Sequence, residues 1–263
     1  MAQPEKAVPF RKDFVMREDE VLDRLVALGF SDADASTLAD HFLDAEVRGK
    51  KGHGLSRVEW LSARPVEFDP AASPKRLVHE TAYERWDGNG SLGYLTLAAV
   101  VEAQLADPPE RARLIVAQRC FPTGALGYWV RKLAQAGLVA FLTATSPPRL
   151  AHPDGGAQLA GTNPLAIAVP SSDGRPLVGD VSMGAVTYGD VIAGEARADE
   201  LVPFGGKQAH KAFALALGLQ LLVDSLVTEP GYGAVLLVAR PEADPVPALR
   251  ARAEGVRLPG NGV

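Results

Sequence analysis

Two neighbouring segments near the start of the chain carry apolar residues at helical spacing. The first runs from Glu18 to Leu28 and stops at Gly29, a residue type that commonly ends helices in the left-handed conformation. The second opens at Ser31, which is followed by an acid as in a capping box, and it keeps one apolar side until Gly49. The pattern predicts two helices, and the second leads into a basic loop.

Beyond residue 80, strand-like and helix-like patterns alternate. Short apolar or alternating runs predict strands at 81–87, 113–117, 138–143, 165–169, 177–181 and 235–238. Longer apolar patterns predict helices that end near 105, cover 124–136 and cover 212–227. Segment 187–204 is weakly patterned and acidic, so we expect an irregular crossing there, and residues 241–263 lack periodicity and should form an extended arm. Alternation of this kind predicts an α/β fold.

The composition is that of a globular protein with room for a sizeable core. Of the 263 residues, 47% are hydrophobic and 22% are charged, and the formal net charge is -5. The acidic balance gives no general attraction to nucleic acid, so we expect no nucleic-acid partner. The longest apolar helix, at 212–227, is interrupted by Gln220 and Asp224, and residues 1–17 lack an apolar run. We therefore expect a soluble protein without a membrane anchor or signal peptide.

Cysteine usage points to a reducing compartment. The single cysteine, Cys120, has no second cysteine for an internal disulfide, which favours a cytoplasmic protein. With so few sulfur ligands a structural zinc site is not expected, and no metal site is predicted. Cysteine is more often a small buried residue than a nucleophile, and we expect this for Cys120.

The basic loop after the second predicted helix is the first candidate for chemistry. It places His53 between two glycines, with Arg48 before it and Arg57 after it. Histidine exchanges a proton near neutral pH, and flanking glycines permit close backbone approaches that side chains would block. Helical spacing resumes at Arg57, which puts this arginine about one turn beyond His53, where it could face the same cavity. Taken alone, the same pattern also describes an exposed turn.

Two further features lie beside apolar strands. Asp180 is near the end of the strand at 177–181, and a carboxylate in so apolar a context needs a partner because an unpaired buried charge is costly. The loop 161–164, with the sequence Gly-Thr-Asn-Pro, precedes the strand at 165–169, where backbone amides and short polar side chains can meet a ligand. As bare sequence, this loop is also only a turn.

Residues 88–93 match the pattern G-x-G-x-x-G of dinucleotide-binding folds. That fingerprint needs a buried strand before it and an acid after the following strand. Here the preceding residues are mostly polar, and the next strand ends in Gln118 and Arg119. We therefore favour a glycine-rich turn that opens a helix. The alternative is a Rossmann site in which Arg119 would indicate NADP.

Several stretches, in order, resemble the type 2 malate/L-lactate dehydrogenase family, which is unrelated to the Rossmann lactate and malate dehydrogenases. Loop 48–57 resembles the family motif R-G-x-x-S-H-G-x-x-R. Residues 87–93 resemble its motif D-G-x-x-x-x-G, and residues 155–164 resemble its motif G-G-x-x-x-x-G-T-N-P. Val178 to Asp180 is similar to a family strand that ends in aspartate, and residues 210–212 to the start of a long apolar helix. The match runs from about residue 18 to about residue 227.

The resemblance implies an α/β fold with a mixed sheet and flanking helices, distinct from the Rossmann fold. It implies a cytoplasmic homodimer that uses NADPH or NADH to reduce a 2-oxo acid or a cyclic 2-imino acid, as a ketimine reductase does, in a biosynthetic role. The expected organisation is a helical segment with the His53 loop at 1–85, a cofactor-binding core at 86–240, and an arm at 241–263 that packs on the core or on a partner subunit. The substrate and the choice between NADH and NADPH stay open.

Carried over by position, the resemblance makes His53 the acid/base and Asp180 its partner. Arg48 and Arg57 become candidates for the substrate carboxylate, because an arginine binds a carboxylate through two parallel hydrogen bonds. An imidazolium gives the proton when hydride reaches carbon, and an aspartate keeps the imidazole oriented. The residues implied at the cofactor are Thr162, Asn163, Pro164, His210 and Lys211.

The sequence departs from the family pattern at several positions. Gly52 stands where the family has a serine, Pro122 where it has a second histidine, and residues 182–184 read Ser-Met-Gly in place of Ala-Thr-Ser. The segment before the glycine pair and the region after the long helix are also shortened. These departures motivate two alternatives. One is a non-redox acid/base enzyme, such as an isomerase, cyclase or lyase, that reuses the scaffold, and the other is a binding subunit without activity.

Overall fold

The structure is a computed structural model that describes residues 16–64 and 67–260. At its N-terminal end lie α1 (Glu18–Ala27), α2 (Asp32–Val47), the short 3-10 turn η1 (Lys51–His53) and α3 (Ser56–Ser62). The Ser31 hydroxyl caps α2 by accepting a hydrogen bond of 3.2 Å from the backbone N–H of Asp34. The two predicted helices, and the helical restart after the basic loop, are confirmed.

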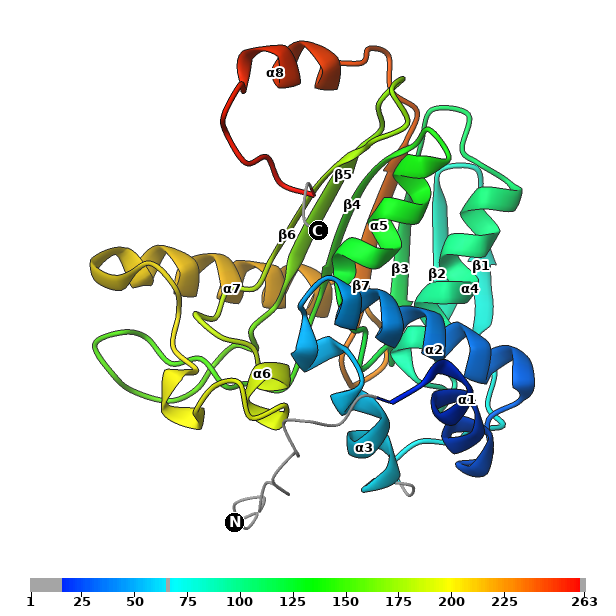
Figure 1. Cartoon of the computed structure of the whole chain (residues 1–263), viewed down its shortest axis with the longest axis vertical. Coiled ribbons are helices and arrows are strands. Elements are labelled where there is room, and N and C mark those ends of the chain that lie inside the picture. The colour runs from blue at the N-terminus through cyan, green and yellow to red at the C-terminus, as the bar shows by residue number, and fades with distance from the viewer. Residues whose placement is uncertain (1–15, 65–66, 261–263) are drawn as a thin grey trace.

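A mixed sheet of seven strands forms the centre of the molecule (Figure 1). The strands are β1 (Lys75–His79), β2 (Tyr83–Asp87), β3 (Ala112–Gln118), β4 (Val139–Ala144), β5 (Leu165–Val169), β6 (Leu177–Val181) and β7 (Ala234–Ala239). Their order across the sheet is β1-β2-β3-β7-β4-β5-β6. Strands β2 and β3 are parallel, and the other neighbours are antiparallel. The predicted mixed α/β fold is confirmed, and it differs from the mostly parallel sheet of a Rossmann domain.

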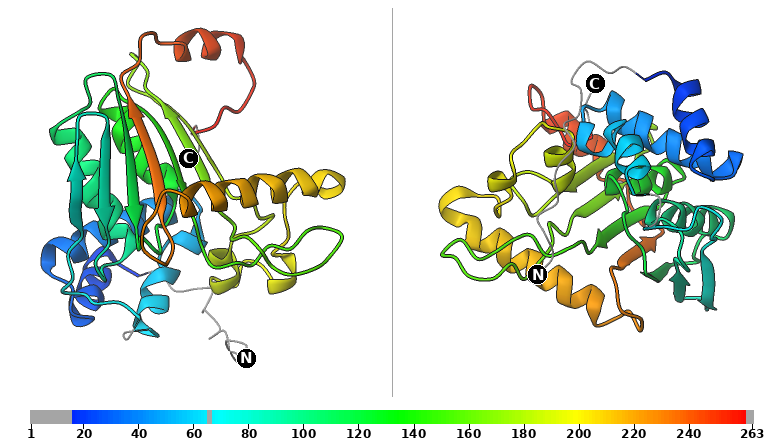
Figure 2. Two further views of the ribbon diagram at one scale, coloured as in Figure 1. Left: turned by 180° about the vertical axis from the view of Figure 1, so that it is seen from behind. Right: turned by 90° about the horizontal axis from the view of Figure 1, so that it is seen from below.

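Helices cover the two faces of this sheet unequally. α4 (Gly93–Ala106) and α5 (Leu126–Gln135) lie on one face, whereas α7 (Ala209–Asp224) lies on the other, near one end of the strands (Figures 1 and 2). Alternate residues of β7 follow this division, because successive side chains of a strand point to opposite faces. Leu236 is buried in the main core and Val235 packs with Val223 of α7, while Leu237 stays 42% exposed. None of the helices in the described residues is long and apolar enough to cross a membrane.

Cys120 lies in the main core, as expected for a small buried residue. Its thiol donates to the carbonyl oxygen of Gly93 over 3.6 Å. Burial raises the pKa of this thiol to about 12, so it is uncharged at neutral pH.

Three elements differ from the sequence-based prediction. The β1 residues are mostly exposed at the edge of the sheet, so no hydrophobic pattern marks that strand. α6 (Tyr188–Ile192) lies in the segment expected to be irregular, and it is too short to show periodicity. The expectation of an extended arm at 241–263 is wrong, because α8 (Val246–Arg252) forms there after Pro245.

The C-terminal arm folds back on the β5–β6 connection. Arg250 of α8 donates hydrogen bonds to the Asp173 carboxylate and to the carbonyl oxygen of Arg175. The core is continuous across the expected boundary at residue 85, since residues of α1, α2, β2 and β4 share one apolar cluster. The three-part division of the chain stays a prediction.

The glycine-rich turn at 88–93 joins β2 to α4. The Asp87 carboxylate accepts hydrogen bonds from Nε and Nη2 of Arg119 at 2.8 and 2.7 Å, and from Gln118 at 2.8 Å. A Cβ on Gly88 would lie 2.1 Å from the Arg119 carbonyl oxygen, so glycine allows two backbone segments to pack closely here. Arg119 is thus a structural partner of Asp87 in a mixed sheet, and the Rossmann alternative is wrong.

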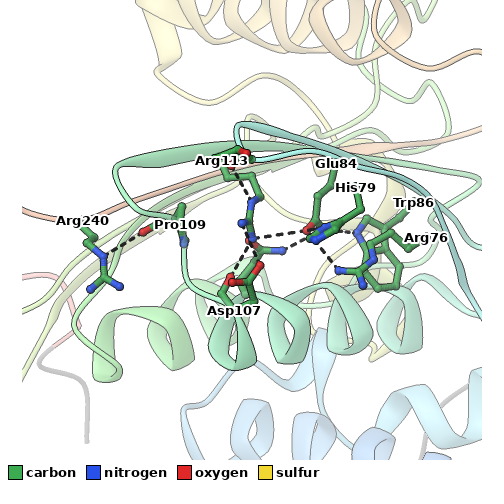
Figure 3. Close-up of polar contacts among 10 residues, drawn as sticks. Arg76, His79, Glu84, Trp86, Asp107, Pro109, Arg113 and Arg240 are labelled. Atoms are coloured by element: carbon green, nitrogen blue, oxygen red, sulfur yellow. Dashed lines mark hydrogen bonds and ion pairs between the residues drawn. The ribbon is translucent and has the colours of Figure 1, made fainter.

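A buried carboxylate joins β1, β2, β3 and α4 (Figure 3). Glu84 of β2 is fully buried and accepts hydrogen bonds from Nε1 of Trp86 at 2.7 Å and from Nε2 of Gln104 at 3.1 Å. Nδ1 of His79 lies 3.0 Å from the same carboxylate, and Nη1 of Arg113 lies 3.5 Å from it. A buried charge is stable only with such partners. The cluster fixes the outer strands against α4.

Replacing Glu84 with Gln should destabilise the protein, because Arg113 would lose its buried counter-charge and keep only the exposed Asp107 carboxylate, 3.1 Å from its Nη2 atom. Loss of the charged hydrogen-bond acceptor at a buried position should cost about 1–3 kcal/mol in the free energy of unfolding. Urea denaturation followed by circular dichroism measures the change. Glu242→Gln is a matched control, since Glu242 meets Arg111 on the surface with 90% of its side chain exposed and should change little. Equal effects of the two substitutions would contradict the prediction.

Candidate active site

A cleft of about 470 Å³ opens where the N-terminal loop 49–57 meets one edge of the sheet. The end of β4, the start of β5 and the end of β6 all reach this edge, because these strands run antiparallel to their neighbours. The segment before α5 and the first turn of α6 complete the walls. Of the residues predicted from sequence, the cleft is lined by His53, Arg57, Thr162, Pro164 and Asp180.

His53 lies on η1, directly after the end of α2. Its Nδ1 atom is buried and has no hydrogen-bond partner among the described residues. Burial, the cations of Arg57 and Lys50, and the neighbouring His41 hold the pKa of His53 well below its usual range. At neutral pH, therefore, the imidazole is uncharged and carries one N–H.

Asp180 pairs with Lys50, a residue that sequence analysis did not select. The Nζ atom of Lys50 and the Asp180 carboxylate form an ion pair and a hydrogen bond, and both residues line the cleft. The carboxylate rests against the first turn of α5, where a Cβ on Gly127 would lie 2.9 Å from its Oδ2 atom. The partner expected for this carboxylate, which is partly buried, is therefore present. No hydrogen bond joins Asp180 to His53 among the residues that the structure describes.

Arg57 of α3 is a buried cation on the cleft wall. Its side chain is 7% exposed, and its Nε donates a hydrogen bond of 2.7 Å to the carbonyl oxygen of Gly52. The guanidinium lies 5.6 Å from the ring centre of Trp60, which also lines the cleft. No carboxylate within residues 16–64 and 67–260 forms an ion pair with Arg57. Because an unpaired buried charge is costly, this position favours an anionic ligand.

Arg48, the other arginine predicted to bind substrate, points elsewhere. Its Nε donates to both carboxylate oxygens of Asp44 at 3.0 Å, and Nη1 of Arg131 binds the same carboxylate at 2.9 Å. Arg48 does not line the cleft. The structure thus brings Arg57 to His53 and leaves Arg48 in an ion pair on the flank of α2.

The residues predicted to bind the cofactor separate into three groups. Thr162 and Pro164 line the cleft. Asn163 is fully buried, and its amide donates to the Ala216 carbonyl oxygen at 2.9 Å and to Gln220 at 3.0 Å, so it ties the loop to α7. His210 and Lys211 are exposed in the first turn of α7, outside the cleft.

Arg149 and Tyr188 are cleft residues that the sequence analysis missed. The Cζ atom of Arg149 lies 3.4 Å from the centre of the Tyr188 ring, a cation–π contact between the loop after β4 and α6. Arg149 has no carboxylate partner among the described residues. An arginine directly after Pro147 and Pro148, in the loop that follows a buried strand, is the signal that could have identified it.

Close packing explains why position 52 is a glycine. A Cβ there would lie 2.5 Å from the backbone nitrogen of Asp190 and from the carbonyl carbon of Gly189. A Cβ on Gly189 would in turn lie 2.6 Å from Nη2 of Arg57. The first turn of α6 thus occupies the space of the serine that the resemblance implies. A side chain is equally excluded at Gly184, where a Cβ would lie 2.5 Å from the Val186 carbonyl oxygen.

His41 of α2 supports the segment that carries the cleft wall before α5. It is fully buried, and its Nε2 accepts a hydrogen bond of 3.1 Å from the backbone N–H of Ala125. Tyr94 and Trp129 pack against its ring, with ring centres 5.0 and 5.3 Å away. Burial lowers the pKa of His41 to about 3, so the side chain is neutral over most of the pH range.

The buried His41 should make the protein acid-sensitive. Its pKa is about 3 in the folded chain against an ordinary value of 6.5, so the unfolded chain takes up the proton first as pH falls. Stability is complete above pH 6.5 and declines toward pH 3, with a slope of about 1.4 kcal/mol per pH unit from this group. His41→Gln should flatten that slope in urea denaturation at pH 7, 6 and 5. His152→Gln should keep the slope, because that side chain is 43% exposed, and equal slopes in all three proteins would refute the assignment.

The fold and the cleft define an α/β protein with a mixed, non-Rossmann sheet and a site at the ends of its strands, and comparison with known proteins identifies its family. The family model for malate/L-lactate dehydrogenase matches residues 16–206. The chain belongs to this family, as the sequence motifs predicted.

Named relatives act on several substrates. The chain is 32% identical over 194 residues to (2R)-3-sulfolactate dehydrogenase (NADP(+)) of Chromohalobacter salexigens, covering 72% of this chain and 58% of that protein. It is 31% identical over 205 residues to the Delta(1)-pyrroline-2-carboxylate/Delta(1)-piperideine-2-carboxylate reductase of Pseudomonas aeruginosa, covering 72% and 59%. The chain thus spans a little over half the length of these relatives.

Solved structures share the fold. A dehydrogenase from Sinorhizobium meliloti superposes with a TM-score of 0.80 at 23% identity, covering 93% of this chain and 88% of that one. The delta1-piperideine-2-carboxylate reductase from Pseudomonas syringae superposes with a TM-score of 0.78 at 24% identity, covering 94% and 91%.

Proposed function

We propose that the protein is an NAD(P)H-dependent oxidoreductase that reduces a C=O or C=N bond beside a carboxylate. The observation that carries this proposal is Arg57, a buried guanidinium without a carboxylate partner on a cleft that also holds His53 and Lys50. A 2-oxo or cyclic 2-imino acid supplies the missing anion as its carboxylate, and its reducible bond starts at the carbon next to that carboxylate. The two imines named for one relative are cyclic 2-imino acids, and the sulfolactate named for another is a 2-hydroxy acid, the reduced form of a 2-oxo acid.

The residues of the cleft fit a nicotinamide dinucleotide. Arg149 is a second cation without a carboxylate partner among the described residues, and its stacking on Tyr188 holds the guanidinium in place for a cofactor phosphate. Thr162 and Pro164 form the adjoining wall. A bound reduced nicotinamide supplies hydride. The names of relatives include both NAD(+) and NADP(+).

The protein's own residues then bind and orient the substrate. Arg57 binds the carboxylate, and the Trp60 ring forms an apolar wall beside it. The neutral His53 offers one N–H for a hydrogen bond, and the Lys50 ammonium is held in the cleft by Asp180. His53 and Lys50 thus place hydrogen-bond donors and positive charge where negative charge develops on the substrate oxygen.

We also propose a cytoplasmic homodimer with a reductive, biosynthetic role. The sheet face that carries α7 supports the dimer, because large apolar side chains lie exposed there. They are Leu215, Leu221 and Leu222 of α7 and Leu237 of β7. Contiguous exposed apolar side chains commonly mark an interface. The single cysteine supports a reducing compartment.

The first test is oxidation of NADH or NADPH, followed by absorbance, with sulfopyruvate, oxaloacetate and piperideine-2-carboxylate. Arg57→Met should lower kcat/KM about 100-fold, mostly through KM, because losing one partner of a buried charge pair costs about 3 kcal/mol. Arg111→Met is the control, since Arg111 is 88% exposed and remote from the cleft. If no cofactor is oxidised with any of these substrates, or turnover proceeds without nicotinamide, the proposed function is wrong.

The second test concerns the cofactor. Arg149→Met should weaken binding of reduced cofactor about tenfold, as expected for loss of one charge-assisted hydrogen bond. Titration of nicotinamide fluorescence measures the Kd without turnover. The KM of the carboxylate substrate should stay close to that of the wild type. An unchanged Kd would refute the assignment to the cofactor, and an unchanged Kd with a raised substrate KM would assign Arg149 to the substrate.

A further inference from the structure

The ion pair between Lys50 and Asp180 places a protonated amine inside the cleft. We infer that Lys50, and not His53, gives the proton to the substrate oxygen when a 2-oxo acid is reduced. This inference rests on the proposed function. It assigns a role to a lysine that the motif-based prediction, with its pair of His53 and Asp180, leaves without one.

The geometry holds Lys50 in place for this task. Lys50 extends from the loop after α2, while Asp180 comes from the end of β6, 130 residues further along the chain. The Asp180 side chain is 13% exposed and is backed by the first turn of α5 at Gly127, so the carboxylate is fixed. Lys50 itself is 39% exposed, which leaves it a route to solvent for recovering a proton.

His53 lacks what an imidazolium needs in this position. The charged and titratable groups that act on it are Arg57 of α3, Lys50 of its own loop and His41 of α2, and each of them disfavours a second proton. The carboxylates that line the cleft are engaged elsewhere. Asp180 binds Lys50, and Glu67 pairs with Arg64. Asp190 of α6 accepts hydrogen bonds from the backbone N–H and the hydroxyl of Thr187. Lys50, by contrast, has a carboxylate partner for its ammonium group in Asp180.

The reaction balances with Lys50 as the donor. Hydride from a reduced nicotinamide forms the new C–H bond at C2, and the π electrons of the C=O bond move to oxygen. That oxygen takes one proton from the Lys50 ammonium, which gives the 2-hydroxy acid and leaves a neutral amine. The amine regains its proton from water. Neutral His53 acts as a positioning residue that donates an N–H hydrogen bond.

A cyclic imine provides an internal comparison. Such a substrate reacts as its iminium ion, which already carries the proton, so hydride addition gives the amine without any acid. Removal of Lys50 should therefore slow reduction of the C=O bond and spare reduction of the C=N bond, provided that both are measured at saturating substrate.

The experiment compares Lys50→Met and Lys50→Ala with the wild type on a 2-oxo acid and on piperideine-2-carboxylate. For the 2-oxo acid kcat should fall at least about 100-fold, the usual contribution of general acid catalysis, and for the imine it should change less than about threefold. Ethylammonium should restore 2-oxo acid reduction to Lys50→Ala, because it supplies the deleted ammonium. Lys51→Met is the matched control, since Lys51 meets Glu195 on the surface and lies outside the cleft.

A second readout needs no cofactor and no turnover. Long-range proton–nitrogen NMR of the ligand-free protein, assigned with His53→Gln, should show neutral His53 at pH 7. Four results would each overturn the inference. They are protonated His53 at pH 7, equal losses of kcat on both substrates, absence of rescue by ethylammonium, and activity of the wild type on imines alone. Failure of the wild type to oxidise NAD(P)H with any substrate would instead refute the proposed function, so the two failures are distinct.

Discussion

Hydrogen bonding of β7 to a strand on each side holds the two halves of the sheet together. β7 pairs with β3 through Ala112 to Ala117 and with β4 through Val139 to Ala144, and both pairings use all six of its residues. Without this strand, β1 to β3 and β4 to β6 would share no ladder. The cleft depends on that union, because Tyr94 and Phe121 come from one half and Asp180 from the other. A strand near the end of the chain therefore sets the shape of a site whose residues precede it.

The cations that line the cleft fall into two groups, those with a carboxylate partner in the protein and those without one among the described residues. Two cations, Lys50 and Arg64, have carboxylate partners within the protein, whereas Arg57 and Arg149 have none among the described residues. An ion pair holds both side chains in place and adds little to the free energy of folding, whereas a buried cation without a partner favours an anionic ligand. This division separates groups that shape the site from groups that recognise what enters it. Together with burial, which is the larger cause, the positive charge of Arg57 and Lys50 holds the pKa of His53 well below its usual range.

Sequence patterns predicted the features that depend on neighbours in the chain. The helices before and after the loop, the proximity of His53 to Arg57, and the strand that carries Asp180 all follow from local periodicity. Side-chain pairings between segments that are far apart in the chain were not predictable from local sequence patterns. Asp180 binds Lys50 across 130 residues, and Arg48 turns to Asp44 on its own helix. Nothing in local spacing distinguishes these outcomes from the expected ones, because the choice of partner is made by tertiary packing.

The remaining failures have similar physical causes. β1 is an exposed edge strand, and α6 and α8 are too short for their periodicity to be seen. Arg149 entered the site only because the loop after β4 meets α6, a contact that the sequence leaves unmarked. The motif resemblance supplied the family, but it offered His53 and Asp180 as a pair that the packing has rearranged around Lys50.

Burial of the one thiol has a practical consequence. With Cys120 enclosed and uncharged, the one thiol of the chain is protected from alkylating reagents. A cysteine introduced anywhere on the surface would thus be the single site of chemical labelling, without any prior removal of native residues. Fluorophores or spin labels placed at the rim of the cleft would report ligand binding there in an otherwise unmodified protein.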